Sequence, residues 1–281
     1  MKVSGFLSGA VTVLCFASGA LLLPASAAAQ SAQTDWQSGK WQFTATVYGW
    51  FPTINGKVNF PGDLGSTDIH VPFHDILDHL KMGAMGALDA HNGRWGMFTD
   101  VLYLDVGGVK SQTRDFSIGN IGLPASATTD LSLDLKSWVW TVAGEYRVAS
   151  DPTWTVDLLA GARMLYIKPT LGYSITGDLG PIVIPGRSGS KEVSETLWDG
   201  IVGIKGRYAF GDNREWFVPF YLDVGTGQTK LTWQGVAGIG YSYRWGDVLA
   251  TWRYLDWNAK SGKPIADLNM SGPMLGMVFH W

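Results

Sequence analysis

The residues best suited to chemistry lie close together in the segment HVPFHDILDHL, which runs from His70 to Leu80 and holds three of the five histidines. Its proline and the apolar residues after it predict a short amphipathic helix. On such a helix Asp75 and His79, four residues apart, share a face and could bind a metal ion or exchange a proton. The same side chains would also suit a solvated loop. The candidates are His74, Asp75, Asp78 and His79.

A Tyr-Leu-Asp tripeptide occurs three times, ending at Asp105, Asp223 and Asp256. Each copy ends an apolar, alternating segment. The three carboxylates could form a ring that gathers a cation or a sugar. Alternatively, the tyrosine belongs to a membrane interface and the aspartate begins a loop, which is the interpretation that we favour.

Common catalytic motifs are missing from the sequence. It contains no Gly-x-Ser-x-Gly, no His-Glu-x-x-His and no Walker-type phosphate loop. We therefore expect no enzyme, no cofactor and no metal centre. The net charge of −3 gives no reason to expect a nucleic-acid partner.

The elements that must position these residues are β-strands, because polarity alternates with a period of two from Trp41 onward. We predict an all-β fold, a transmembrane antiparallel up-and-down β-barrel of about ten strands, with eight or twelve if a segment is divided differently. The expected strands are 41–50, 82–91, 95–106, 131–148, 154–167, 197–210, 216–224, 231–245, 248–257 and 268–281.

Connection lengths alternate along the chain. Short turns follow the even-numbered strands, whereas the first three odd-numbered strands are followed by the long segments 51–80, 107–130 and 168–195. Short turns on one rim and long loops on the other are typical of outer-membrane barrels, with the short-turn rim in the periplasm. An even strand count places both chain ends on that rim.

The 14 tryptophans support this arrangement, because most fall near strand ends. We predict one aromatic belt at the short-turn rim and a second at the opposite rim, where a membrane has its two interfaces. The first belt comprises Trp41, Trp95, Trp154, Trp216, Trp245 and Trp281; the second comprises Trp50, Trp138, Trp198, Trp233, Trp252 and Trp257.

If the apolar parity of each strand faces lipid, the other parity lines the lumen. Inward charges in a narrow barrel should pair, and could either fill the barrel or form the constriction of a channel. Arg253 conflicts with this pattern, because placing Tyr254 and Asp256 inward sends the arginine to lipid. The predicted lumen residues are Asp89, His91, Glu145, Arg147, Asp157, Arg163, Asp199, Lys205, Arg207, Gln234 and Arg244.

The N-terminus reads as an export signal. An apolar run from Phe6 to Leu23 is followed by small residues, so we expect a signal peptide over 1–29, a short periplasmic segment over 30–40 and the barrel over 41–281. Cys15 lies in the signal, and the remaining chain therefore has no disulfide.

The stretches Tyr48-Gly49-Trp50, Gly93-Arg94-Trp95-Gly96 and Arg253-Tyr254-Leu255-Asp256, with the terminal MVFHW, resemble small bacterial outer-membrane β-barrel proteins of the OmpA and OmpW class. The resemblance implies an outer-membrane location, contact with membrane lipid and lipopolysaccharide, and recognition of the last strand by the barrel-assembly machinery. Omptin proteases also have ten-stranded barrels. An omptin-like site would need Asp105 or Asp223 beside His74 or His79, but no local motif of that class matches.

We thus expect a structural barrel or a narrow passive pore for small solutes or ions. The alternative is a barrel that binds a surface ligand through 51–80, 107–130 and 168–195, and an omptin-like or lipid-modifying hydrolase is a minor option. The solute, the ligand, the openness of the lumen and the oligomeric state stay open at this point.

Overall fold

The computed structural model describes residues 39–59, 66–110, 127–179, 182–263 and 265–281. The predicted signal peptide lies outside the described residues. Within the described ranges, no helix is long and apolar enough to cross a membrane.

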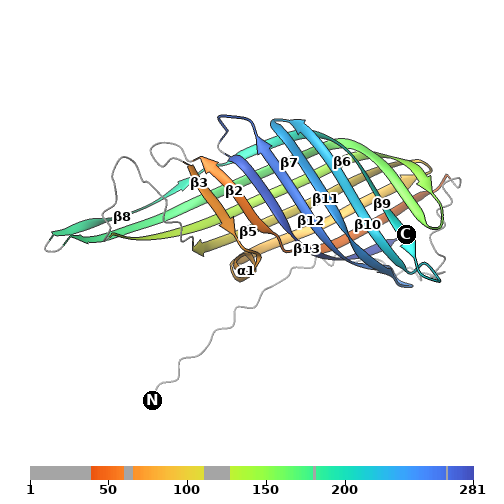
Figure 1. The fold of residues 1–281 in the computed structure, drawn as a ribbon, viewed down its shortest axis with the longest axis horizontal. Coiled ribbons are helices and arrows are strands. Elements are labelled where there is room, and N and C mark those ends of the chain that lie inside the picture. Colours follow the sequence, from red (N-terminus) through yellow and green to blue (C-terminus); the bar gives the residue numbers. More distant parts are fainter. Residues whose placement is uncertain (1–38, 60–65, 111–126, 180–181, 264) are drawn as a thin grey trace, which may run out of the picture.

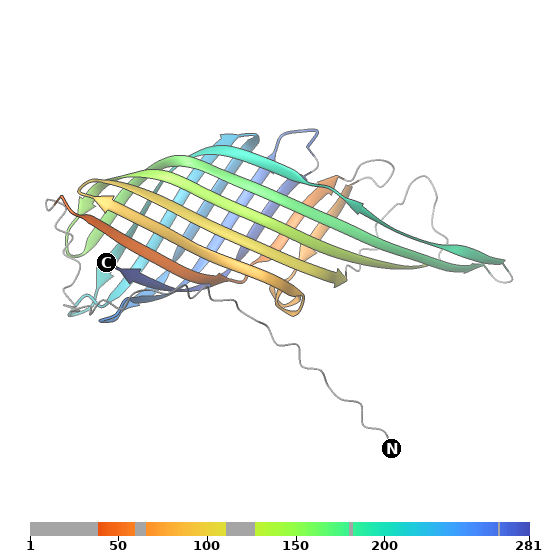
Figure 2. The ribbon, with the colours of Figure 1, turned by 180° about the vertical axis from the view of Figure 1, so that it is seen from behind.

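Ten antiparallel strands close into a barrel (Figures 1 and 2), which confirms the predicted fold class. Each strand pairs with the next in the order given below, and β13 returns to β1, from Thr44 opposite His280 to Trp50 opposite Met274. Two backbone hydrogen bonds between Phe43 and Trp281 extend that closing pair. The barrel strands are β1 (Trp41–Trp50), β4 (Leu80–Asn92), β5 (Trp95–Lys110), β6 (Ala127–Ser150), β7 (Trp154–Leu179), β9 (Glu195–Phe210), β10 (Trp216–Gly227), β11 (Thr229–Ser242), β12 (Asp247–Ala259) and β13 (Ile265–His280).

The long segments expected as loops are largely regular structure, which corrects the prediction for 51–80 and 168–195. The first contains β2 (Thr53–Asn59), β3 (Ser66–Val71) and α1 (Phe73–Asp78). The second continues β7 and adds β8 (Ile182–Glu192), which pairs with β7. Of 107–130, only 111–126 fall outside the described residues. These strands were not predicted because they are short, and the apolar residues on the inward face of TINGKVN, Ile54 and Val58, are separated by a glycine.

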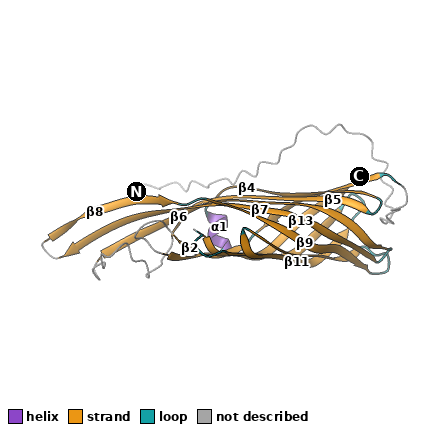
Figure 3. Cartoon of the chain, turned by 90° about the horizontal axis from the view of Figure 1, so that it is seen from above, coloured by secondary structure: helices purple, strands orange, loops and turns teal. Residues whose placement is uncertain are grey.

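β6, β7 and β8 together project well beyond the rest of the barrel (Figures 1 and 3). They leave the rim opposite the short turns, which we call the extended rim. The other end, the short-turn rim, carries the turns after β4, β6, β9 and β11.

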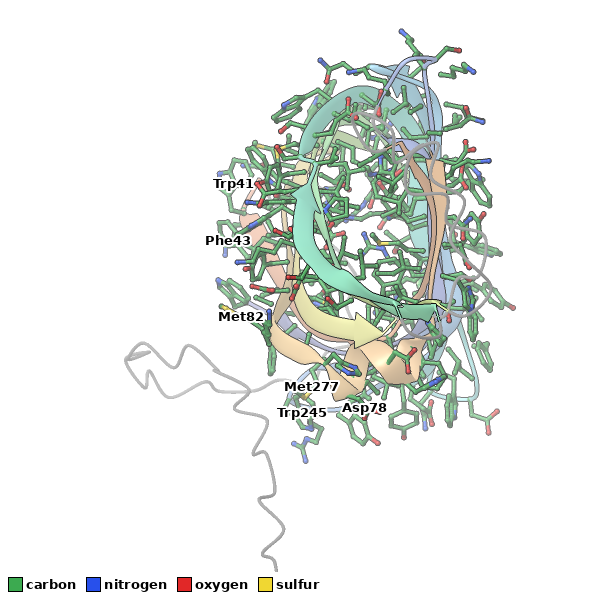
Figure 4. All side chains as sticks on the ribbon, turned by 90° about the vertical axis from the view of Figure 1, so that its left-hand side faces the viewer. Trp41, Phe43, Asp78, Met82, Trp245 and Met277 are labelled. Carbon is green, nitrogen blue, oxygen red and sulfur yellow. The ribbon has the colours of Figure 1, made fainter. Side chains whose placement is uncertain are left out.

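The outer wall is apolar and aromatic. Figure 4 shows Trp41, Phe43, Met82, Trp245 and Met277 on the outside of the barrel. The six tryptophans of the first predicted belt are 42% to 70% exposed, as expected for side chains that face lipid. The prediction of the second belt is wrong for Trp50 and Trp257. Their positions on β1 and β12 direct both side chains inward, where they are 2% and 1% exposed.

The interior changes character along the barrel. Toward the short-turn rim it is charged, whereas toward the extended rim it is an apolar core. The exterior changes in the opposite sense, from apolar to charged. On β5, Leu104 and Val106 face inward, while Asp105 between them pairs with the exposed Lys136 at 3.2 Å. Lipid outside permits a polar interior, and water outside requires an apolar one. The inversion therefore marks where the barrel leaves the membrane.

Candidate functional site: the charged lumen

A cluster of six ionisable side chains fills the lumen near the short-turn rim. His91 is its centre: its Nε2 atom lies 2.8 Å from Glu145 Oε2, 3.2 Å from Asp89 Oδ1 and 3.7 Å from Asp157 Oδ2. These contacts join β4, β6 and β7. We call the cluster the lower network; it comprises Asp89, His91, Glu145, Arg147, Asp157 and Lys205.

Two cations complete the lower network. Lys205 Nζ contacts Asp89 and lies 2.7 Å from Glu145 Oε1. Arg147 donates two hydrogen bonds to Asp157, of 2.8 Å from Nε and 3.0 Å from Nη2. The three carboxylates thus face a lysine, an arginine and a histidine ring, so the chain itself supplies the polar partners that buried carboxylates require.

Asp89, His91 and Glu145 also bring one potential metal-ligand atom each within 4.8 Å of one another. Lys205, however, places its ammonium group among the same carboxylates. A divalent cation there would meet a like charge at short range. The residues therefore fit an ion-pair network better than a metal centre.

Gly96 allows His91 to adopt its position. A side chain at this residue of β5 would overlap the imidazole ring, which packs directly on the glycine backbone. The turn sequence Asn92-Gly93-Arg94 brings β4 and β5 together, and His91 pairs with Gly96 in register. The imidazole is thereby pressed against the wall and aimed at Glu145.

Arg163 forms the most deeply buried ion pair of the described residues. Its Nη1 atom donates to Asp223 Oδ1 at 2.9 Å, its Nη2 atom donates to Oδ2, and its Nε atom donates to Thr141 Oγ1 at 3.2 Å. The side chains of Arg163 and Asp223 are both 0% exposed. This two-pronged contact inside the lumen links β7 to β10, past the intervening strand β9.

A second arginine cluster lies at Arg253. Its Nη2 atom donates to Asp100 Oδ2 at 2.6 Å and to Gln234 Oε1 at 2.9 Å, and its Nη1 atom donates to Tyr48 Oη at 2.8 Å. The tyrosine in turn donates to Asp100. The sequence left open whether Arg253 or its neighbours Tyr254 and Asp256 face the lumen. On β12, Arg253 faces inward and Tyr254 and Asp256 face outward.

Sequence reasoning missed Asp100 and Tyr48. Both lie on the inward parity of their strands, so the alternation of β1 and β5 contained the necessary signal. Their partnership could not be read from the sequence, because Asp100 and Arg253 are separated by 153 residues.

The remaining predicted lumen residues are distributed around these clusters. Arg207 Nη1 donates to Asp247 Oδ2 at 3.2 Å, and Asp199 Oδ1 accepts the backbone N–H of Thr229 at 2.9 Å. The prediction for Arg244 is wrong: β11 ends at Ser242, and Arg244 is exposed in the turn that follows.

The histidine-rich segment forms the expected helix, α1, directly after Pro72. His74 Nε2 lies 3.2 Å from Asp75 Oδ1, whereas His79 Nδ1 bonds the backbone carbonyl of Asp75 at 2.9 Å. Asp78 is exposed. The structure therefore does not bring the Asp75 carboxylate and the His79 ring together as a metal or acid/base pair.

The three Tyr-Leu-Asp aspartates do not form a ring. Asp223 faces the lumen and binds Arg163, Asp105 pairs with Lys136, and Asp256 accepts a 3.2 Å hydrogen bond from Tyr254. Neither Asp105 nor Asp223 is joined to His74 or His79. The omptin-like combination is thus not assembled.

By sequence, neither a protein-family model nor a curated protein matches the chain. Among solved structures, it is similar to the outer membrane protease OmpT from Escherichia coli, with 9% identity, a TM-score of 0.53 and coverage of 87% of this chain and 98% of that one. The translocator domain of the autotransporter NalP from Neisseria meningitidis matches with 13% identity, a TM-score of 0.38 and coverage of 85% and 88%. Ail of Yersinia pestis matches with 11% identity, a TM-score of 0.31 and coverage of 86% and 98%.

At such identities the OmpT likeness speaks for the fold alone. The chain has the fold of an outer-membrane β-barrel, and its lipid-facing wall with two aromatic belts is the exterior that such a membrane requires. Fold and exterior together place it in the bacterial outer membrane.

Proposed function

We propose that the protein is a surface-binding barrel, closed to solutes, that presents its extended rim to the outside of the cell. One observation carries the proposal: the side chains that face the lumen bind one another and are buried. The Arg163–Asp223 pair and the Arg253 cluster cross the middle, and an apolar core lies above them.

This interior argues against a passive pore as the working state. A solute would have to separate fully buried ion pairs and then cross an apolar core, and each broken pair would leave an unpaired buried charge. About eight strands give an interior that side chains just fill, so ten strands leave little spare room.

The extended rim supplies the binding surface. β6, β7 and β8 build a three-stranded projection, and the β2–β3 hairpin adds a second one, paired with β13. Regular strands hold a binding surface more rigidly than free loops would. We further propose that lipopolysaccharide, the lipid that surrounds this rim, is a ligand, and that the barrel-assembly machinery recognises β13.

Two lysines on the outer wall, one exposed and one half-buried, support contact with anionic headgroups. Lys136 and Lys168 lie opposite each other on β6 and β7, just above the exposed Trp138. Each has an acidic partner, Asp105 at 3.2 Å and Glu192 at 2.8 Å, that a lipid phosphate could replace.

Two measurements on the purified barrel test the proposal. In planar bilayers the wild-type protein should give no reproducible unitary steps, whereas a conducting outer-membrane porin reconstituted in the same way should give them and so show that the assay detects an open barrel. Reproducible steps from the wild type would establish the pore instead.

The second measurement is binding of purified lipopolysaccharide. A variant in which a short turn replaces residues 172–190 should bind less than the full chain, while a variant with a changed short turn at Asp212 and Asn213 should bind normally. Equal binding by all three would remove the projection from the proposal.

A further inference from the structure

The barrel wall has a seam between β1 and β4. Their pairing ends at Val47 opposite Gly86, although β1 runs on to Trp50 and β4 begins at Leu80. Beyond this point, the backbone N–H of Trp50 donates to Met85 Sδ at 3.2 Å rather than to a carbonyl of β4. The β2–β3 hairpin that follows pairs with β13 and does not rejoin β4.

The helix α1 connects that hairpin to β4 and lies next to β5 (Figure 2), so it spans the interval that the strands leave open there. Ile76 is 3% exposed and joins the apolar core inside the barrel, whereas Phe73 and Leu77 are exposed on the outside. The cover is short, six residues, with no side-chain cap at Pro72. A backbone hydrogen bond of 3.1 Å from Gly107 to His79 links its C-terminal end to β5.

Both sides of the seam are apolar. Inside lie Trp50, Ile54 and Ile76, all buried in one core, with Met85 packed against them. Outside, Met82 joins Phe73 and Leu77 as an exposed apolar side chain. Met85, beside the point where the pairing ends, lies opposite Leu102, on the membrane side of the polarity inversion. Unpaired backbone is costly in hydrocarbon, so a wall that stops pairing there needs a compensating cover.

A cation stands beside this apolar path. A bulge between Leu80 and Met82 turns Lys81 outward, where its Nζ atom lies 2.9 Å from Asp134. The Lys81 side chain is 55% exposed, and Lys136 lies on the same outer wall. An alkyl chain in the seam would thus have its headgroup next to lysine, a combination found in anionic lipids.

We propose that the seam is a lateral binding site for one acyl chain of an anionic outer-leaflet lipid. The chain enters between β1 and β4 and takes the apolar space that Ile76 occupies, and α1 moves outward as it enters. The lipid phosphate replaces Asp134 as the partner of Lys81. The site is distinct from the β6–β8 projection, because it lies in the wall between β1 and β4.

The experiment uses full-length barrel in phosphatidylglycerol vesicles that contain a phosphatidylglycerol with a photoreactive diazirine in one acyl chain. After irradiation, labelled residues are identified by mass spectrometry. The wild type should be labelled at Trp50, Ile54 and Ile76, in addition to the lipid-facing wall. In Ile76→Ala, labelling of Trp50 and Ile54 should rise on the order of tenfold, because the competing side chain is smaller.

Matched variants separate a seam from ordinary lipid contact. Leu77→Ala changes the outer side of the same helix and should leave labelling of Trp50 and Ile54 unchanged, while Ile76→Trp should abolish it. Heat-modifiable gel mobility verifies that each variant has folded. Labels confined to Phe73, Leu77 and Met82 in every variant would overturn the proposal.

The headgroup is tested with Lys81→Gln. In this variant the phosphatidylglycerol probe should no longer label Trp50 and Ile54. An otherwise identical phosphatidylcholine probe should label these residues to the same extent in the variant and in the wild type. An equal response to both probes would overturn the assignment of Lys81 to the phosphate.

Discussion

Replacing Arg163 by methionine should destabilise the barrel strongly. The change removes both N–H donors to Asp223 and the 3.2 Å hydrogen bond to Thr141, but keeps a side chain of similar length. Asp223 would remain as a carboxylate without its cation in a position that is 0% exposed. The cost lies in that unpaired charge more than in the lost hydrogen bonds.

The size of the effect follows from complete burial. Removing one partner of a buried ion pair costs about 3 to 5 kcal/mol, while replacing both partners by apolar residues is often neutral. Arg163→Met should therefore lower the free energy of unfolding by about 4 kcal/mol, and Asp223→Leu by a similar amount. The double variant should lose less than either single variant, because no charge is left unpaired.

Urea unfolding in lipid vesicles, followed by tryptophan fluorescence and gel mobility, measures these differences. Arg244→Met is the control, since Arg244 is exposed in a turn and should change stability by at most about 0.5 kcal/mol. The reasoning would be refuted if Arg163→Met cost no more than Arg244→Met, or if the losses of the two single variants simply added in the double variant.

Two further predictions concern the short-turn rim. Deleting Trp281 removes two backbone hydrogen bonds to Phe43 and the stacked contact between the two rings. The closing β1–β13 pair should then form less efficiently, which would be measured as slower or incomplete insertion into vesicles. Normal assembly of the truncated chain would contradict this prediction. Asp151, in the turn before β7, accepts backbone N–H groups of Trp154 and Thr153, which hold the pKa of its carboxyl below the ordinary value of 3.8. The stabilisation of the turn by the Asp151 carboxylate should be complete above the ordinary pKa, and it should be lost as the pH falls through the lower pKa of the folded state. An NMR titration that gives the Asp151 carboxyl a pKa at or above the ordinary value would contradict this.

The closed barrel could be predicted because lipid imposes a pattern on every strand that crosses it. One parity must be apolar and the strand ends carry aromatic residues, so β7 or β12 can be recognised from its own residues. The same parity directed Arg163, Glu145 and Lys205 inward. The extension strands carry a weaker pattern, because water surrounds them and the inward apolar residues Ile54 and Val58 of β2 are separated by Gly56. β2, β3 and β8 were therefore expected as loops.

The sequence by itself determined the ten strands of the barrel, their order along the chain, the two rims and most of the inward positions, since each depends on local polarity and turn chemistry. Only the tertiary structure decided which charges meet: Arg253 with Asp100, Arg163 with Asp223, and His91 with Glu145. It also decided that the pairing of β1 with β4 ends at Val47 and that α1 lies next to β5 beyond this point. Curvature and stagger bring distant strands across a common lumen, and no local pattern encodes those distances.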